Sequence, residues 1–249
     1  MAKKVSRAVD SVEFIDISAD VQSEPAKFPV DAGISNLRVL YTEGNVSMPV
    51  ELSIQTSTGS GRGVHMSRLV KAAKAKKAGG IEEWLRWIAG QVNETQPGSS
   101  VTCRYELPYE DRFVRVIVRT KERGALTYKF VVDGLTACPC SKKMIGVGHM
   151  QRAEITLIMK SRKALDAREV ISRVSECFSA TPTEELKRLD EAKKILDAQA
   201  NPRFAEDLVR ECVSRFPGAM FVGSRCFESI HVHDAVATWS SRPGWEPTL

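Results

Sequence analysis

The sequence contains no long apolar run, and none of its apolar stretches approaches the ~20 residues that a membrane-spanning helix needs. Its first residues, MAKKVSRAVDSVEF, are basic, but no apolar stretch of signal-peptide length follows them. These absences predict a cytoplasmic protein that has no membrane partner. Aromatic residues make up only 7% of the chain, which disfavours a surface that binds nucleic acid by stacking on its bases.

Cysteine is also scarce, with six residues in 249, and disulfides are rare in the reducing cytoplasm. Two of the six, Cys138 and Cys140, flank Pro139. No second closely spaced pair occurs in the sequence, which argues against a zinc ribbon. The remaining four stand singly among apolar neighbours, where a free cysteine is usually buried: Cys103, Cys177, Cys212 and Cys226.

The overall composition is that of a folded globular protein. Hydrophobic residues make up 43% and charged residues 27% of the chain, and its length allows a substantial core. The net charge of +5 is mild, so a small polyanion such as a nucleotide suits it at least as well as a nucleic acid. The one basic cluster, RLVKAAKAKKAGG, is predicted to be the solvated face of a helix.

The spacing of apolar residues divides the chain into an N-terminal arm, 1–33, and two units, 34–122 and 123–249. In the first unit we predict strands over 34–44, 46–58, 100–110 and 112–121, and helices over 65–78 and 81–94. In the second unit we predict strands over 125–139, 151–161, 219–233 and 234–240, and helices over 166–178, 183–200 and 201–216. Asn201 is the predicted N-cap of the last helix, with Pro202 at its first position. The first unit therefore follows the order β-β-α-α-β-β, and the second repeats this order of strands and helices with three helical stretches.

Histidine occurs only four times, and a single histidine is most often structural. Two of the four, His231 and His233, stand in the stretch ESIHVHDA. In a strand, residues two apart face the same side, so both rings are predicted on one face, with Ile230 and Val232 on the other. That face is a candidate wall of a binding site.

The stretch CPCSKKMIGVGH places Cys138 eleven residues before His149, with a glycine-containing loop between them. Such a loop can bring a thiolate and an imidazole to one metal ion. Two such ligands and a carboxylate would leave a fourth position open, as in catalytic zinc sites. The spacing alone selects no carboxylate, and a structural cysteine pair remains the alternative reading.

Six motifs occur together in one order: GRGVHMSRLV, TACPCSKK, GHMQRAE, LKRLDE, NPRFAEDLVR and ESIHVHDAVA. In order and spacing, from about residue 60 to residue 237, they resemble the GTP cyclohydrolase type IB family, which includes the archaeal enzyme MptA. The resemblance implies an α+β tandem tunnelling fold of two β-β-α-α-β-β units, with antiparallel sheets and helices on one face. It also implies a homo-oligomer, a dimer or a tetramer.

The resemblance also implies a metal site, carried mostly by the second unit. Its ligands would be Cys138, His149 and Glu191, and its ion one divalent metal per subunit, Fe²⁺, Zn²⁺ or Mn²⁺. Cys140 matches a second family cysteine near the metal.

The implied substrate is GTP, and several further residues match motifs expected to bind it. Glu206 would hold the guanine edge, because a carboxylate can accept from its two adjacent N–H donors. Glu228, His231 and His233 would line the pocket, with His231 as the preferred proton shuttle. The expected partners of the triphosphate and of the pocket rim are Lys142, Arg152, His65 and Arg68, the last two from the other unit or a neighbouring subunit.

The implied reaction opens the imidazole ring of GTP, releases formate and forms a 7,8-dihydroneopterin phosphate, either the triphosphate or the 2′,3′-cyclic phosphate, for methanopterin or folate synthesis. Two alternatives remain from the sequence. One is an RNA-binding module in which the metal is structural. The other is a tunnelling-fold nitrile reductase that acts on a 7-deazaguanine with a nucleophilic cysteine and NADPH.

Overall fold

The computed structural model describes residues 20–75, 79–121 and 124–244. The helices are η2 (Val21–Ser23, a 3-10 helix), α1 (Met66–Ala75), α2 (Ile81–Asn93), α3 (Pro139–Ile145), α4 (Ala167–Ser175), α5 (Arg188–Ala200) and α6 (Ala205–Arg215). The strands are β1 (Asp31–Glu43), β2 (Val46–Ser57), β3 (Ser100–Tyr109), β4 (Arg112–Lys121), β5 (Leu126–Ala137), β6 (Met150–Ser161), β7 (Ala219–Cys226) and β8 (Ala235–Ser240).

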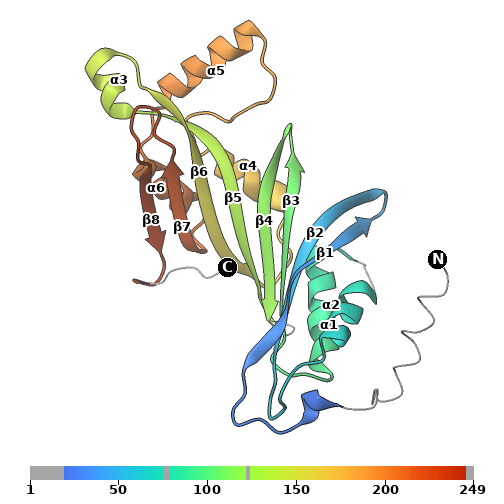
Figure 1. Ribbon diagram of the computed structural model, residues 1–249. Helices are drawn as coiled ribbons and strands as arrows, with labels where there is room; N and C mark the ends of the chain where they lie inside the picture. Colours follow the sequence, from blue (N-terminus) through green and yellow to red (C-terminus); the bar gives the residue numbers. More distant parts are fainter. Residues whose placement is uncertain (1–19, 76–78, 122–123, 245–249) are drawn as a thin grey trace, which may run out of the picture.

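The eight strands form one antiparallel sheet, in which they stand side by side in chain order (Figure 1). Helices α1 and α2 lie between β2 and β3 in the chain, and α4 to α6 lie between β6 and β7. This order confirms the expected α+β class, in which each half of the chain places its helices between two pairs of strands, as in the tandem tunnelling fold that the resemblance implies. The second half differs from a β-β-α-α-β-β unit in having three helices between β6 and β7, and α3 as an addition between β5 and β6. The junction at 122–123 and residues 1–19 of the predicted arm lie outside the described residues, so the unit boundaries stay predictions.

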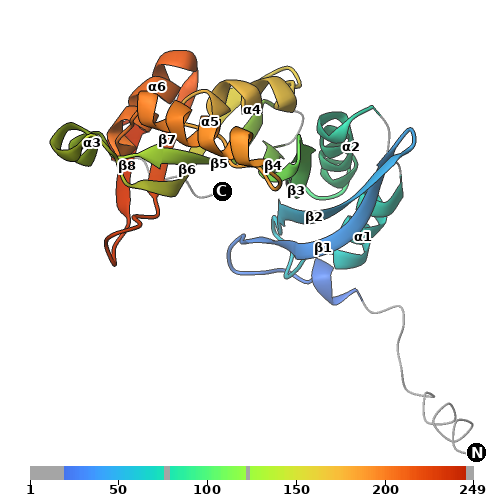
Figure 2. The ribbon, with the colours of Figure 1, turned by 90° about the horizontal axis from the view of Figure 1, so that it is seen from above.

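The core lies between the sheet and the helices packed on it, which Figure 2 shows along one side of the curved sheet. Along β5, Tyr128 and Phe130 are fully buried, and Ile155 and Leu157 continue this pattern on β6. Alternate residues of a strand point to one face, so the apolar positions of each strand gather on the helix side. Each such side chain contributes ~1.5–3 kcal/mol when it is fully buried.

The other face of the sheet is polar. Ser53 on β2 stands opposite Thr102 on β3, which in turn stands opposite Arg119 on β4. Alternation in the strands therefore accounts for both faces. Among the described helices, none is long and apolar enough to cross a membrane.

The helix predicted from Thr183 begins only at Arg188. Two tertiary contacts hold the residues ahead of it in a non-helical conformation. The backbone N–H of Glu184 donates to the Asp111 carboxylate at 3.0 Å, and the Lys194 ammonium donates to the Thr183 hydroxyl. Local helix propensity gives way here to contacts with distant residues.

The last helix starts at Ala205 rather than at Pro202, so the predicted N-cap at Asn201 is wrong. Asn201 instead ends α5, and its side-chain amide donates to the Phe178 carbonyl at 3.2 Å. In α6 the Asp207 carboxylate accepts from the backbone N–H at the N-cap position, at 3.0 Å. Asparagine favours the N-cap position of helices, but Asn201 makes a contact with a residue distant in the sequence instead.

Residues 178–180 cross the end of β5 and fix its last residues. The Leu135 N–H donates to the Ala180 carbonyl at 2.9 Å, and the Ala137 N–H donates to the Ser179 hydroxyl at 3.2 Å. Because Ala137 is the last residue of β5, these bonds fix the position at which Cys138 and Cys140 follow the strand.

Replacing Gly134 with alanine is expected to destabilise the protein, because an added Cβ would lie 2.0 Å from the Phe178 ring. Overpacking of this kind costs ~1–3 kcal/mol. Gly218→Ala is the matched control, since nothing lies within 4 Å of a Cβ at that position. Unfolding in urea measures both variants, and equal midpoints for the two would contradict the close packing at Gly134.

Candidate active site

The stretch after β5 is not only a loop, as the sequence predicted, but begins with the two-turn helix α3. Pro139 is its first residue, where the missing N–H costs no hydrogen bond. Cys138 is the N-cap residue, in an extended conformation. The two cysteines of the pair therefore differ: Cys138 stands at the helix start and is partly buried, whereas Cys140 lies inside α3 and is exposed.

Hydrogen bonds place Cys138 beside His149. The Cys138 N–H donates to the His149 carbonyl at 2.9 Å. The Ser141 hydroxyl accepts from the His149 N–H at 3.1 Å and donates to the Cys138 carbonyl at 3.4 Å. Gly148 allows this close approach, because a Cβ there would lie 2.6 Å from the Cys138 carbonyl oxygen. Two of the three expected metal ligands thus leave the sheet at the same point.

Helix α5 is tied to this stretch by one side chain. The Gln199 amide accepts from the Gly148 N–H at 2.8 Å and donates to the Gly148 carbonyl at 2.7 Å. Both backbone groups of Gly148 are therefore satisfied by α5. The C-terminal end of α5 lies against the site.

The third expected ligand is not brought to the other two. Glu191 is exposed in the first turn of α5, eight residues before Gln199, which is ~12 Å along a helix axis. Among the described residues, no group of three or more His, Cys, Asp or Glu side chains is close enough to hold a metal ion. The single chain therefore pairs Cys138 with His149 and leaves Glu191 apart.

The His149 ring is surrounded by polar groups from β6 and from the loop after β7. Its Nδ1 lies 2.8 Å from the Gln151 Oε1, 3.4 Å from the Ser229 hydroxyl and 3.9 Å from a Glu228 carboxylate oxygen. The Gln151 amide nitrogen donates to the other Glu228 oxygen at 3.2 Å. Glu228 therefore joins the site, as the sequence predicted, through a contact that the sequence did not predict.

The prediction that His231 and His233 lie on a strand is wrong. Strand β7 ends at Cys226, and the chain forms an irregular loop until β8 begins at Ala235. Val232 is fully exposed, so the apolar residues of this stretch have no buried face to pair with. The two rings nevertheless lie together, stacked with their centroids 5.0 Å apart.

Glu206 lies in the first turn of α6 and is exposed. Its negative charge acts on the nearby thiol of Cys226. Burial, the largest cause, raises the pKa of this thiol to about 11; a hydrogen bond with Thr136 lowers it, and the charges of Glu228, Glu206 and Asp234 raise it further. Cys226 therefore stays a neutral thiol near pH 7 and is no candidate nucleophile.

The expected phosphate partners are spread over the molecule. Lys142 belongs to α3, while the exposed Arg152 alternates with the buried Gln151 on β6 and so points to the opposite face of the sheet. His65 and Arg68 lie at the start of α1, in the first half of the chain, and Figures 1 and 2 both place α1 far from α3. The single chain does not bring these two residues to Cys138.

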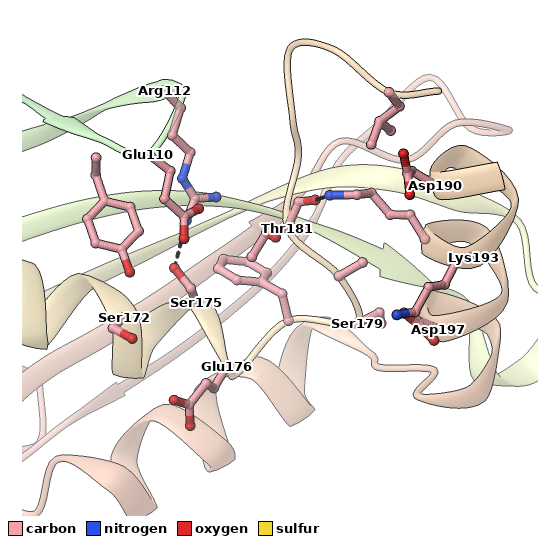
Figure 3. A pocket seen from close by; sticks show the side chains of 15 residues that line it. Glu110, Arg112, Ser172, Ser175, Glu176, Ser179, Thr181, Asp190, Lys193 and Asp197 are labelled. Atoms are coloured by element: carbon pink, nitrogen blue, oxygen red, sulfur yellow. Dashed lines mark hydrogen bonds between the residues drawn. The ribbon is translucent and has the colours of Figure 1, made fainter. Parts of the chain in front are cut away.

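A separate cavity of about 550 Å³ lies between the turn after β3, the end of α4 and α5 (Figure 3). Arg112 donates to the Ser175 hydroxyl at 2.8 Å along its wall. Its charged lining residues are of both signs: Glu110, Arg112, Glu176, Asp190, Lys193, Lys194 and Asp197. The predicted site residues, all of which the structure describes, do not line this cavity, and its mixed charge does not favour a triphosphate.

An eight-stranded antiparallel sheet in chain order, with its helices inserted between β2 and β3 and between β6 and β7, is the arrangement expected of a tunnelling-fold protein, and Cys138, His149 and Glu228 form a candidate catalytic centre at one end of it. The model of the family GCHY-1, type I GTP cyclohydrolase FolE2, matches residues 19–237. The chain therefore belongs to the type I GTP cyclohydrolase FolE2 family, a family of enzymes.

The curated relatives agree with this assignment. GTP cyclohydrolase FolE2 of Caldicellulosiruptor saccharolyticus is 31% identical over 201 residues, which are 72% of this chain and 77% of the relative. GTP cyclohydrolase FolE2 of Pelobacter propionicus is 28% identical over 233 residues, 84% of this chain and 88% of the relative. Among solved structures, uricase from Arthrobacter globiformis aligns with a TM-score of 0.48 and 10% identity over 90% of this chain and 97% of that one.

Sequence reasoning missed three residues that build the site: Ser141, Gln151 and Gln199. Only Gln151 had a signal in the sequence. It stands two residues after His149 at the start of a predicted strand, and such residues share a face. Ser141 and Gln199 contribute through contacts that no local pattern reveals.

Thiol labelling distinguishes the cysteines of the site from those of the core. In metal-free protein at pH 8, Cys140 is expected to react first with iodoacetamide because it is exposed. Cys103 and Cys226 are expected to react only after unfolding, since burial raises their pKa to about 12 and about 11 and keeps them as thiols. Peptide mass spectrometry measures each site, with urea-unfolded protein as the control. Equal labelling rates for Cys226 and Cys140 in the folded protein would contradict this arrangement.

Proposed function

We propose that the protein hydrolyses the imidazole ring of GTP, releases its C8 as formate and closes the product into a 7,8-dihydroneopterin phosphate for pterin biosynthesis. One observation carries the proposal. In a chain that belongs to a GTP cyclohydrolase family, residues of three separate motifs, Cys138, His149 and Glu228, contact one another or a shared neighbour at one end of the sheet.

The proposed cofactor is one divalent metal ion per subunit, held by Cys138, His149 and Glu191. The donor set fits such an ion in chemistry, because thiolate, imidazole and carboxylate together suit Zn²⁺, Fe²⁺ and Mn²⁺. Backbone hydrogen bonds bring the residues of the first two donors together, which supports this set. Glu191 would join them only if α5 or the residues around it took a different position. The chemistry such an ion supplies is the activation of water for attack on the purine C8 near neutral pH.

Residues of the chain bind and orient the guanine. The exposed Glu206 carboxylate has two oxygens, which suit the N1–H and the amino group of guanine. The stacked His231 and His233 rings are exposed in the loop that follows Glu228, and exposed rings can contact a bound base. Histidine is the side chain most often used to move protons in catalysis, and we assign the transfer to N7 and N9 to His231, with His233 in support.

The triphosphate requires positive charge. Lys142 lies on α3, four residues before Gly146, where the loop that returns to His149 begins, and is the proposed partner from the same chain. Arg68 and Arg152 are the further proposed partners, since guanidinium groups bind phosphate oxygens in pairs. Within one chain neither faces Cys138, because α1 lies far from α3 and Arg152 points to the opposite face of the sheet, so both would have to act from a neighbouring copy. The product is either the triphosphate or the 2′,3′-cyclic phosphate. The mass of the product distinguishes the two.

Membership of the cyclohydrolase family favours this function over the two alternatives, the RNA-binding module and the nitrile reductase. Incubation with GTP separates the three, because only the cyclohydrolase produces formate and pterin fluorescence without NADPH or RNA.

Removing Cys138 tests the metal site. Cys138→Ala is expected to lower metal content and formate release at least ~100-fold, because loss of a residue that only supports a ligand already costs about 10- to 100-fold. The measurements are metal content by mass spectrometry and formate release from GTP. Full activity with undiminished metal would refute the assignment.

Glu191→Gln is expected to lower metal affinity in the same way. Glu185→Gln is its matched control, because Glu185 is an exposed glutamate of the same segment that the site does not use. Equal metal affinity in the two variants would remove Glu191 from the ligand set.

We further propose that the enzyme is a homo-oligomer in which a second copy covers the site. Many large apolar side chains around it are exposed in the single chain: Met144, Ile145, Val147, Leu189, Leu196, Ile230 and Val232. Ile145 is 75% exposed and Leu189 is 85% exposed, although burying either residue would be favourable. A neighbouring copy would also supply His65 and Arg68, which this chain holds at a distance.

Mixing two inactive variants tests a shared site. Oligomers assembled from His65→Ala chains and Cys138→Ala chains are expected to regain formate release that neither variant shows alone, because some sites then combine two intact halves. The assay uses chains with different affinity tags, so that mixed oligomers are isolated before measurement. Mixed oligomers that stay inactive would show that the site is not shared in this way.

A further inference from the structure

A chain of hydrogen bonds connects His149 to Glu228 through one buried amide. His149 lies directly before β6, and Gln151 is the second residue of that strand, so their side chains share a face. The Gln151 Oε1 lies 2.8 Å from the His149 Nδ1, and the Gln151 Nε2 lies 3.2 Å from a Glu228 oxygen. Two hydrogen bonds thus connect three side chains from two separate segments of the chain.

The direction of each bond follows from the chemistry of the groups. A carboxylate accepts hydrogen bonds and donates none, so Glu228 takes the amide –NH₂ of Gln151. That choice turns the carbonyl oxygen of Gln151 toward His149. A carbonyl oxygen also only accepts, so the proton between them must belong to the His149 Nδ1. A neutral imidazole carries one proton, which leaves Nε2 with a free lone pair.

Burial makes this arrangement effective. Gln151 is 8% exposed, and the side chains of His149 and Glu228 are 16% and 12% exposed. Water therefore competes poorly for these bonds, and reversing the amide would place two acceptors, Gln151 Oε1 and Glu228, against each other. The other neighbour of Nδ1, the Ser229 hydroxyl at 3.4 Å, can accept as well and does not oppose the assignment.

We propose that Gln151 is a positioning residue that holds His149 in the Nδ1–H tautomer and so presents a bare Nε2 as a metal ligand. The use of Nε2 rests on the proposed function, but the tautomer does not. Glu228 acts in this scheme as the group that fixes the direction of the amide. Partners of this kind orient ligating histidines and raise their basicity.

The tautomer is measured directly on metal-free protein with ¹⁵N-labelled histidine. The wild-type His149, assigned by its loss in a His149→Asn variant, is expected to show a protonated Nδ1 and an unprotonated Nε2. Gln151→Leu removes the acceptor, and Glu228→Gln keeps the shape but removes the fixed direction. Both variants are expected to give a substantial Nε2–H population.

The second readout is Zn²⁺ affinity, measured by competition with a chelator. Gln151→Leu is expected to weaken Zn²⁺ binding about 10- to 100-fold, the usual effect of losing such a partner. Gln91→Leu is the matched control, because the Gln91 amide also donates to a carboxylate, Glu94 at 2.9 Å, but on α2. That control is expected to bind Zn²⁺ as the wild type does.

The outcomes separate this inference from the proposed function. A wild-type protein that binds no Zn²⁺ but shows the Nδ1–H tautomer would refute the metal site and support the role of Gln151. A wild-type His149 with a protonated Nε2, or a Gln151→Leu variant with unchanged tautomer and Zn²⁺ affinity, would overturn the inference and leave the metal site standing.

Discussion

The antiparallel pairing of β5 with β6 is the constraint on which the site depends. Twelve residue pairs, from Leu126 opposite Ser161 to Ala137 opposite Met150, fix the two strands against each other. Cys138 follows the last residue of β5 and His149 precedes the first residue of β6, so the ladder delivers both to the same place. Both strands carry fully buried core residues, so the position of Cys138 and His149 is fixed by the core of the molecule.

Neutral amides then connect the site to the elements around it. Gln199 satisfies both backbone groups of Gly148 from α5, and Gln151 joins His149 to Glu228 in the loop after β7. An amide carries a donor and an acceptor, so it can bridge groups of opposite kind without adding a charge to a buried site. The contacts that support Cys138 and His149 therefore come from side chains that do not titrate, with the Glu228 carboxylate as the exception.

The predicted elements and the observed ones differ where tertiary contacts overrule a local pattern. Alternation of polar and apolar residues predicted a strand through His233. Its apolar residues are exposed rather than packed on the core, and the strand pairing ends at Cys226. Thr183 lies in a helical pattern, yet the Lys194 contact holds it outside α5. Asn201 has the chemistry of a helix N-cap and instead binds a carbonyl across the fold. In each case a contact in the folded chain, or the lack of a surface to pack against, decides the local structure.

Periodicity alone determined the two groups of strands and helices, because burial of one face requires apolar residues every second position in a strand and every third or fourth in a helix. The motifs selected the candidate site residues, Cys138, His149 and Glu228 among them. Only the tertiary structure decided that Gln151 directs the His149 ring and that Glu191 stands apart from it in the single chain. Those features depend on strand register and on how α5 packs, and both are set by contacts between segments that no local pattern in the sequence encodes.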